Sequence, residues 1–489
     1  MPGEEGIVAK SSHPGRVVGI TVGLLILIAA VWLLTGNTTC RFHPERCACS
    51  PIPDPDPPCT INVVLDTSES MRGYFEGQTE FKDVLSRLAS ALDKFKTEPA
   101  KPHCPSAIAF QYYNTNSGTL VPAAADSREF NNALLNDAIP SGTESPLQNM
   151  LEMVVDESSG AATPVPPDSD RPKQCPVAPS DSVLSILVTD SIFSYSDEEI
   201  AKNREVNKDN IKGLAEEVGI IFNKAHALDK SASILAFKSQ FHGTYFNYRN
   251  GRSTWGSVPR PYYFWVIGSA TNVRAVRSFL QAESIIPDHA LDFVIDPFDL
   301  SSTILQYTDR KGTWNRHNDE SPLRIHVRKP FLDDRDKSSG PDNDSRGEIG
   351  FAVGLDLSHL SPDQLSGDYL TKHLRVESQS PDLEIKSVAI KTRAEIEADL
   401  NPRDRGQIPH ATHFVLITTD FKFIKTARLS ISIDDALPSW YLDWSNEDDT
   451  QTDQRTLETT FGLRYFVEAI ARAYDVKGPI AKTTILLER

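Results

Sequence analysis

The chain has 489 residues, which is long for one domain and enough for two or three. Asp and Glu outnumber Lys and Arg by 67 to 50, so the formal net charge is −17. This balance argues against nucleic acid as a partner, because phosphate backbones are bound by clustered Lys and Arg. Apolar residues make up 39% of the chain, which excludes a chain that is disordered throughout.

An uncharged apolar run lies near the start of the chain, at residues 17–34. As a helix it would rise about 27 Å, close to the hydrocarbon thickness of a bilayer. The residues after Leu34 offer no good signal-peptide cleavage site, so we expect an uncleaved, single-pass transmembrane helix. Residues 1–16 would form a cytoplasmic tail, and the bulk of the chain would lie on the periplasmic or extracellular side of the cell membrane. A cleaved signal peptide and a lipid-modified Cys40 are the alternatives.

All six cysteines follow this run, and prolines crowd the segment directly after it. Residues 35–59 therefore predict a Cys- and Pro-rich stalk that is stiff and extended. The position of the cysteines favours an oxidising compartment with disulfide bonds, although the sequence does not choose their pairing. Free thiols are one alternative. Another is zinc, for which the candidate ligands are Cys40, His43, Cys47 and Cys49.

Between residues 60 and 285, strand patterns alternate with helical patterns. Most strand runs are continuously apolar, as in a parallel sheet that is covered on both faces. The alternation predicts an α/β domain with a doubly wound, mostly parallel sheet. Ligands of such sheets bind at the carboxyl ends of the strands. The expected strands are residues 60–65, 107–113, 183–189, 232–240 and 262–268, with helical stripes within residues 81–92, 147–154 and 211–221.

Side chains that carry oxygen stand at the ends of two of these strands. Strand 60–65 runs into residues 66–70, which read Asp-Thr-Ser-Glu-Ser, and strand 183–189 runs into Asp190. Between them, Thr143 lies in a loop that leads into a predicted helix. Carboxylates and hydroxyls without His or Cys suit Mg²⁺ or Ca²⁺, with Mn²⁺ as a further option, and not zinc or copper. The alternative is that these residues only cap helices and turns.

This pattern resembles the von Willebrand factor type A domain, whose fold is Rossmann-like. The metal-ion-dependent adhesion site of that family combines an Asp-x-Ser-x-Ser loop, a Thr from a later loop and an Asp after the fourth strand. The resemblance implies that Ser68, Ser70 and Thr143 bind a divalent cation directly, with Mg²⁺ as the first expectation. It implies that Asp66 and Asp190 act mostly through water or as supporting partners. An acidic side chain of a protein partner would fill the open coordination position.

Three features depart from the family pattern. Ser191 stands where the family often has Gly, and a Pro-, Ser- and Asp-rich insertion occupies residues 157–180. Glu69 and Glu144 add carboxylates close to the candidate site. The added negative charge could favour Ca²⁺, so the sequence leaves the metal preference open.

After residue 286 the pattern changes to short strands, several of which alternate with period two. This spacing predicts a β-rich, sandwich-like domain over residues 286–489 with one helix. Its acidic loops predict solvated surface, because no EF-hand spacing is present. Trp440, Tyr441 and Trp444 are expected in core or edge packing, with an exposed contact patch as the alternative.

Together these features predict a membrane-anchored extracytoplasmic module for adhesion or assembly that captures an unidentified protein partner through a divalent metal. Its one short stalk makes it more similar to bacterial envelope proteins than to animal adhesion receptors. Signatures of serine hydrolases, zinc proteases and phosphate-binding loops are absent from the sequence, so no enzyme is expected. The alternatives are a metal-dependent hydrolase, and a structural subunit of an envelope or transport complex with a degenerate metal site. A bound cation would explain how such an acidic chain attracts an acidic ligand.

Overall fold

The computed structural model describes the chain from residue 60 to residue 489, with gaps. The described residues belong to one compact unit, Asp54–Arg489. The positions outside the description are 1–59, 98–106, 115–117, 140–146, 159–182, 193–207, 248–250, 296, 320, 330–346, 359, 382, 409, 422–425, 452 and 476–477.

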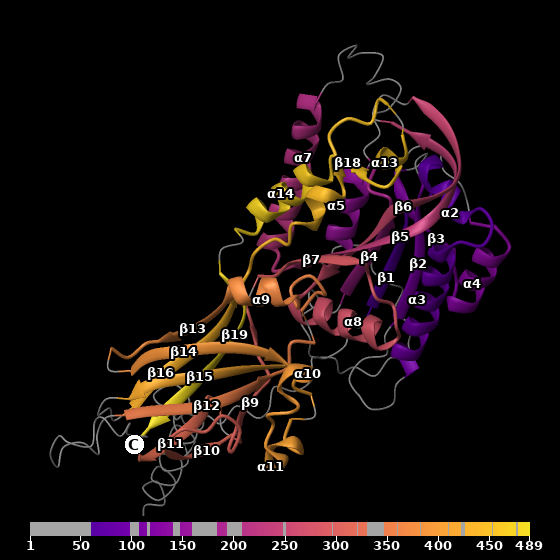
Figure 1. Cartoon of the computed structure of the whole chain (residues 1–489). Coiled ribbons are helices and arrows are strands. Elements are labelled where there is room, and N and C mark those ends of the chain that lie inside the picture. The colour runs from indigo at the N-terminus through magenta and orange to yellow at the C-terminus, as the bar shows by residue number, and fades with distance from the viewer. Residues whose placement is uncertain are drawn as a thin grey trace, which may run out of the picture. The chain divides into compact units, whose positions relative to one another are not determined.

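A seven-stranded sheet forms the centre of the N-terminal part (Figure 1). The strands β2, β1 and β4 pair in parallel, and every other neighbouring pair in this sheet is antiparallel. In their order across the sheet, the strands are β3 (Thr119–Ala124), β2 (Ala107–Asn114), β1 (Thr60–Leu65), β4 (Val183–Thr189), β6 (Arg252–Gly268), β5 (Ser231–Phe246) and β7 (His289–Phe293).

The prediction of a doubly wound, mostly parallel sheet is wrong, because this sheet is mixed. The strands β5 and β6 form a long hairpin, and β6 pairs with β4 in the antiparallel sense. The sequence pattern had ended the first strand at residue 240 and begun the second at residue 262. Both strands continue beyond these limits, so only residues 247–251 connect them. A parallel crossover needs about a dozen residues or more, and this connection is too short for one.

Helices cover both faces of the seven-stranded sheet. Successive residues of β1 point to opposite faces, so Ile61 and Val63 join one core whereas Val64 joins the other. Each helix turns an apolar stripe to the sheet, and burial of these stripes is the main force that holds the layers together. The helices are α3 (Glu80–Thr97), α4 (Ser127–Leu135) and α8 (Ala270–Ala282) on one face, and α5 (Leu147–Ser158), α7 (Lys208–Ala227) and α14 (Leu463–Ala473) on the other.

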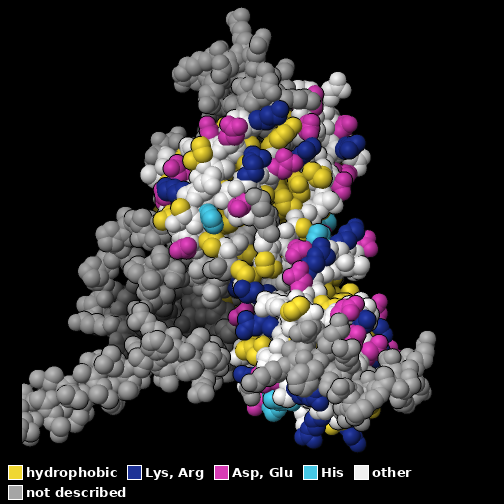
Figure 2. Space-filling model, turned by 90° about the vertical axis from the view of Figure 1, so that its left-hand side faces the viewer, with side chains coloured by type: hydrophobic (Ala, Val, Ile, Leu, Met, Phe, Trp, Pro, Cys, Tyr) yellow, Lys and Arg dark blue, Asp and Glu magenta, His cyan; other side chains and the backbone are white. Residues whose placement is uncertain are grey.

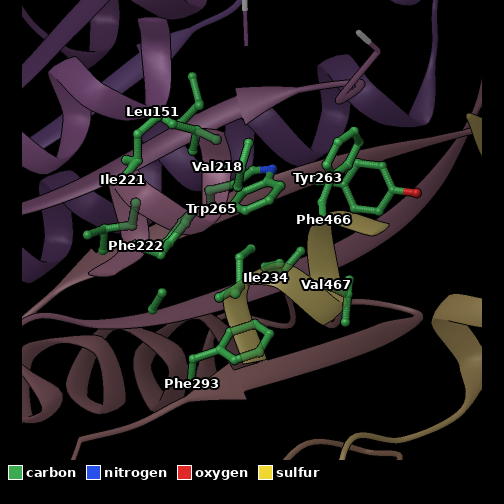
Figure 3. Packing of buried hydrophobic residues seen from close by; sticks show 14 of the residues in the cluster. Leu151, Val218, Ile221, Phe222, Ile234, Tyr263, Trp265, Phe293, Phe466 and Val467 are labelled. Carbon is green, nitrogen blue, oxygen red and sulfur yellow. The ribbon is translucent and has the colours of Figure 1, made fainter. Parts of the chain in front are cut away.

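The helix α14, predicted within the C-terminal region, packs in the core of the first sheet. Figure 3 shows Phe466 of α14 in the same cluster as Phe222 of α7 and Trp265 of β6. Just before α14, Trp440 and Trp444 are 5% and 8% exposed, which confirms core packing for these aromatic residues. A segment from the end of the chain therefore completes the core that supports the candidate site.

Two further sheets enclose a separate core in the C-terminal part. The larger sheet is also mixed, because its last strand pairs in parallel with two others. Its strands are β10 (Thr313–His317), β11 (Leu323–Lys329), β19 (Pro479–Glu488), β16 (Thr426–Asp434) and β13 (Leu374–Ser378), with β8 (Phe298–Asp299) paired to β19. The smaller sheet consists of β14 (Leu383–Thr392), β15 (His413–Phe421), β12 (Gly347–Leu355) and β9 (Ser302–Leu305).

Short elements fill the connections. They are η2 (Glu69–Met71), α2 (Arg72–Phe75), α9 (Gly367–His373), α10 (Arg393–Ile396), α11 (Pro402–Arg405), α12 (Trp440–Asp443), β17 (Ser445–Asn446), α13 (Gln454–Leu457) and β18 (Thr460–Phe461). On the face that Figure 2 shows, acidic and basic side chains of the described residues are interspersed.

The predicted transmembrane helix at residues 17–34, the stalk and all six cysteines lie outside the described residues. In the part of the chain that the structure describes, no helix is long and apolar enough to cross a membrane. The long helices α3 and α7 instead carry charged residues throughout and pack on a sheet. The prediction of a single-pass protein of the cell membrane is therefore corrected: the structure gives it no support.

Candidate metal site

The Asp66 loop and Asp190 lie together at one edge of the seven-stranded sheet. They follow β1 and β4, which are adjacent and parallel, and Leu65 lies beside Val188 in the register. The N–H of Asp66 donates to the carbonyl of Val188 at 2.8 Å, which holds the two strand ends level. The juxtaposition depends only on this parallel pair, so it survives although most of the other strands are antiparallel.

Asp66 organises its own loop and the end of the neighbouring strand. Its Oδ1 accepts the N–H of Ser68 at 2.9 Å, and its Oδ2 accepts the hydroxyl of Thr189 at 2.7 Å. The side chain is buried, so these bonds form away from competing water. Asp66 is therefore placed to orient the serine loop, which fits the supporting role expected for it.

The hydroxyl groups of Ser68 and Ser70 face each other, with their Oγ atoms 2.9 Å apart. Ser68 occupies the N-cap position of η2, yet its side chain makes no capping hydrogen bond within the described part of the chain. Helix capping therefore does not account for this serine. Two adjacent hydroxyls beside two carboxylates form a cluster of hard oxygen ligands.

Asp190 is almost completely buried, with 1% of its surface exposed. Its Oδ1 accepts the N–H of Ile192 at 3.2 Å, whereas its Oδ2 has no hydrogen-bond partner among the described residues. Burial raises the pKa of Asp190 to about 6; the Arg260 guanidinium lowers it, and the carboxylate of Asp66 raises it. Buried polar atoms are normally satisfied, so the Oδ2 atom indicates a place for a water molecule or an ion.

Arg260 of β6 lies next to Asp190 and was not predicted as a site residue. It is 2% exposed, and its Nη2 lies 3.7 Å from Asp190 Oδ2. Its guanidinium lies over the ring of Tyr245 at 4.5 Å and over that of Phe241 at 5.4 Å. The sequence carried a weak signal, since Arg260 stands between two prolines directly before an apolar run. That segment was not recognised as part of a strand.

Ser191, one of the departures from the family pattern, adopts a conformation that favours glycine. Its φ angle is 54°, in the left-handed region that residues other than glycine seldom occupy. Two hydrogen bonds hold it there: its Oγ accepts from the indole of Trp265 at 3.0 Å, and its N–H donates to the Thr189 hydroxyl at 3.0 Å. The backbone shape that glycine would provide is thus kept by side-chain contacts.

Four of the five predicted site residues come together, namely Asp66, Ser68, Ser70 and Asp190. Thr143 lies outside the described residues, as do Glu144 and nearly all of the insertion, so the role of Thr143 stays a prediction. Glu69 is half-buried and its carboxylate lies 3.8 Å from Arg252, which offsets its charge. The extra negative charge that could favour Ca²⁺ is therefore partly neutralised.

The donor set fits a small divalent cation. Carboxylate and hydroxyl oxygens are the ligands that Mg²⁺ and Ca²⁺ prefer, and the buried Oδ2 atom of Asp190 has unused capacity to accept a bond. In the described ranges, at this site as elsewhere, no cluster of three or more His, Cys, Asp or Glu side chains is suited to a metal, so the serine hydroxyls are essential to the donor set. The expectation of Mg²⁺, with Ca²⁺ or Mn²⁺ as alternatives, therefore rests on this cluster of serines and aspartates.

No protein-family model matches the chain, and no curated protein matches it in sequence. Membership of the von Willebrand factor type A family therefore remains a prediction from the strand-end residues. The function has to be argued from the geometry and chemistry of the site.

A half-buried acid, Glu157, lies on the face of the sheet that α5 covers. The amide of Asn62 donates to Glu157 Oε2 at 3.1 Å. Burial raises the pKa of Glu157 from 4.5 to about 7, and hydrogen bonds from Asn62 and Gln111 limit the rise. The folded state therefore holds a proton on Glu157 at pH values where the unfolded chain has lost it.

A Glu157→Gln variant should show that this acid makes stability depend on pH. Because the folded-state pKa is raised, the contribution of Glu157 is fully present below about pH 4.5 and is lost as the pH rises through 7. Thermal melts at pH 5 and pH 8 should show that the melting temperature of the variant increases relative to that of the wild type as the pH rises. An equal difference between the two proteins at both pH values would contradict this prediction.

Proposed function

We propose that the chain binds a divalent cation, first of all Mg²⁺, at Asp66, Ser68, Ser70 and Asp190, and that this cation captures an acidic side chain of a protein partner. The observation that carries the proposal is the buried Oδ2 of Asp190, which lacks a hydrogen-bond partner among the described residues and lies at the cluster that holds the paired serine hydroxyls. The proposal concerns a metal site like that of the von Willebrand factor type A domain, within a mixed sheet.

Each residue has a distinct part in the proposed binding. The Ser68 and Ser70 hydroxyls are neutral ligands, so they would leave most of the charge of the cation available to a further ligand. Asp66 holds the loop through Ser68, and Asp190 offers its Oδ2, which accepts no hydrogen bond among the described residues, to the cation or to water bound to it. A cation held in this way would attract a carboxylate even though the chain as a whole carries a charge of −17.

The interactions that Asp66 and Asp190 already make favour protein binding over metal-assisted hydrolysis. A hydrolase needs a general base within hydrogen-bond reach of the attacking water. Both oxygens of Asp66 already accept hydrogen bonds, and Asp190 lies beside the guanidinium of Arg260. Asp66 is therefore not arranged to take up a proton from a substrate, and Asp190 Oδ2 is paired with a buried guanidinium, so the site is better suited to holding a ligand than to transforming it.

Isothermal titration of the full chain with Mg²⁺, Mn²⁺ and Ca²⁺ tests the proposal. We expect saturable binding of at least one ion by the wild type, and an affinity lower by about 10- to 100-fold in a Ser68→Ala/Ser70→Ala variant. Ser90→Ala is the matched control, because Ser90 is an exposed serine of α3 whose hydroxyl, among the described residues, bonds within the helix turn and to Asn131. Absence of binding by the wild type, or equal affinity in the double variant, would refute the proposal.

A further inference from the structure

We propose that Arg260 is a built-in counter-cation of the site, which keeps its affinity for a divalent ion low until a carboxylate ligand arrives. The inference rests on the proposed function and names the residue that would couple the metal to the partner. The proposed metal binding itself leaves Arg260 unexplained, since its side chain is too deeply buried to touch a partner.

The position of Arg260 is fixed by its surroundings. Its guanidinium is sandwiched against the Tyr245 and Phe241 rings and hydrogen-bonds to the Tyr74 hydroxyl, all of which are uncharged. Its Nε and Nη1 atoms have no hydrogen-bond partner among the residues that the structure describes. The positive charge is thus directed at Asp190, whose Oδ2 lies 3.7 Å from Nη2.

The formal charges explain why this arrangement would couple two ligands. Asp66 and Asp190 bring two negative charges and Arg260 brings one positive charge, so these three groups sum to one negative charge. A divalent cation turns this into one positive charge, which is unfavourable in a buried environment. The carboxylate of a partner restores neutrality. The site should therefore bind the metal more tightly when the carboxylate is present. By linkage, it should bind the carboxylate more tightly, by the same factor, when the metal is present.

Without Arg260, the two aspartates alone would neutralise the cation. Such a site would bind metal tightly and gain little from an added carboxylate. Arg260 therefore lowers the affinity of the site for the metal alone, so that tight metal binding requires a bound carboxylate ligand. This role is one of tuning, because Arg260 contacts Asp190 and is not itself a ligand.

The first test uses the wild-type full chain and needs no variant. Mn²⁺ affinity is measured by isothermal titration in chloride and again in acetate at the same ionic strength, with acetate as the probe carboxylate. We expect acetate to increase Mn²⁺ affinity by about fivefold or more, the lower range of measured coupling between sites. Metal affinity that is the same in both salts would overturn the inference.

The second test compares Arg260→Met, which removes the charge but keeps a long apolar stem, with Arg260→Lys, which keeps the charge. The Met variant should bind Mn²⁺ about tenfold or more tightly in chloride and should lose the acetate effect, whereas the Lys variant should behave like the wild type. Circular dichroism establishes that each variant is folded. If the Met variant does not fold, the acetate experiment on the wild type still tests whether metal and carboxylate binding are coupled.

The outcomes separate this inference from the proposed function. Tight Mn²⁺ binding by the wild type without any acetate effect would overturn the role of Arg260 and leave the metal site standing. Binding by Arg260→Met alone would support the arginine as the cation of the site and overturn metal-dependent capture by the natural chain. Binding by neither protein would overturn both.

Discussion

An Asp190→Ala variant will unfold more easily than the wild type by about 3–5 kcal/mol, because it leaves the buried guanidinium of Arg260 without the carboxylate that it contacts. Arg260 is 2% exposed, and Asp190 is the carboxylate beside its guanidinium. The aromatic rings around the arginine cannot replace the lost negative charge. The measurement is chemical denaturation at pH 8, in a chelator, so that Asp190 is ionised in the wild type and metal binding does not contribute.

A double variant makes this prediction specific to the ion pair. Asp190→Ala/Arg260→Met removes both charges, and we expect it to recover part of the stability that Asp190→Ala loses. Asp137→Ala is the matched control, since Asp137 pairs with Lys82 at 2.7 Å but is 61% exposed. An exposed pair is worth at most about 1 kcal/mol. A loss in Asp190→Ala as small as in this control would contradict the prediction.

An Asp404→Ala variant will lose a comparable amount, about 3–5 kcal/mol, because it leaves two buried and two partly buried donors without an acceptor. Asp404 is completely buried in α11. Its Oδ1 accepts the N–H of Gln306 at 3.0 Å. Its Oδ2 accepts the N–H of Tyr307 at 2.9 Å and both the N–H and the hydroxyl of Thr308, at 2.8 and 2.9 Å.

The size of this effect follows from the backbone groups involved. The three N–H groups belong to the turn after β9 and do not pair with a neighbouring strand. The Asp404 carboxylate accepts all three hydrogen bonds in place of backbone carbonyls. Asp404→Asn keeps one acceptor oxygen and should lose less. Asp399→Ala is the control, because Asp399 is 65% exposed and pairs only at the surface with Lys391. Equal denaturation midpoints for Asp404→Ala and this control would refute the prediction.

Local patterns were informative where a strand is buried and continuous. The predicted strand 183–189 coincides with β4, and the predicted strand 60–65 coincides with β1. Both are short runs in which apolar residues predominate, as is typical of a strand that is buried on both faces. The full length of the hairpin of β5 and β6 was harder to predict from the sequence, because its outer half carries Arg, Ser, Gly and Pro at partly exposed positions. Periodicity therefore ended these strands too early and led to the wrong sheet type.

The C-terminal helix shows a different limit. The helix α14 is amphipathic, with Phe466 and Val467 on its buried side. Its partner, however, is α7 of the first sheet, which lies far away along the chain. An amphipathic pattern states that a face is buried but does not state against which element.

The sequence alone was enough to predict that Asp66, Ser68, Ser70 and Asp190 lie together. These residues directly follow two buried parallel strands, and strand ends carry their side chains to one edge whatever the rest of the sheet does. Only the tertiary structure decided that Arg260 lies beside Asp190. That contact depends on the register between β4 and β6, which a hairpin of unforeseen length sets, and no local pattern encodes it. The charge balance of the site, and with it the expected coupling of metal to ligand, therefore emerges only on folding.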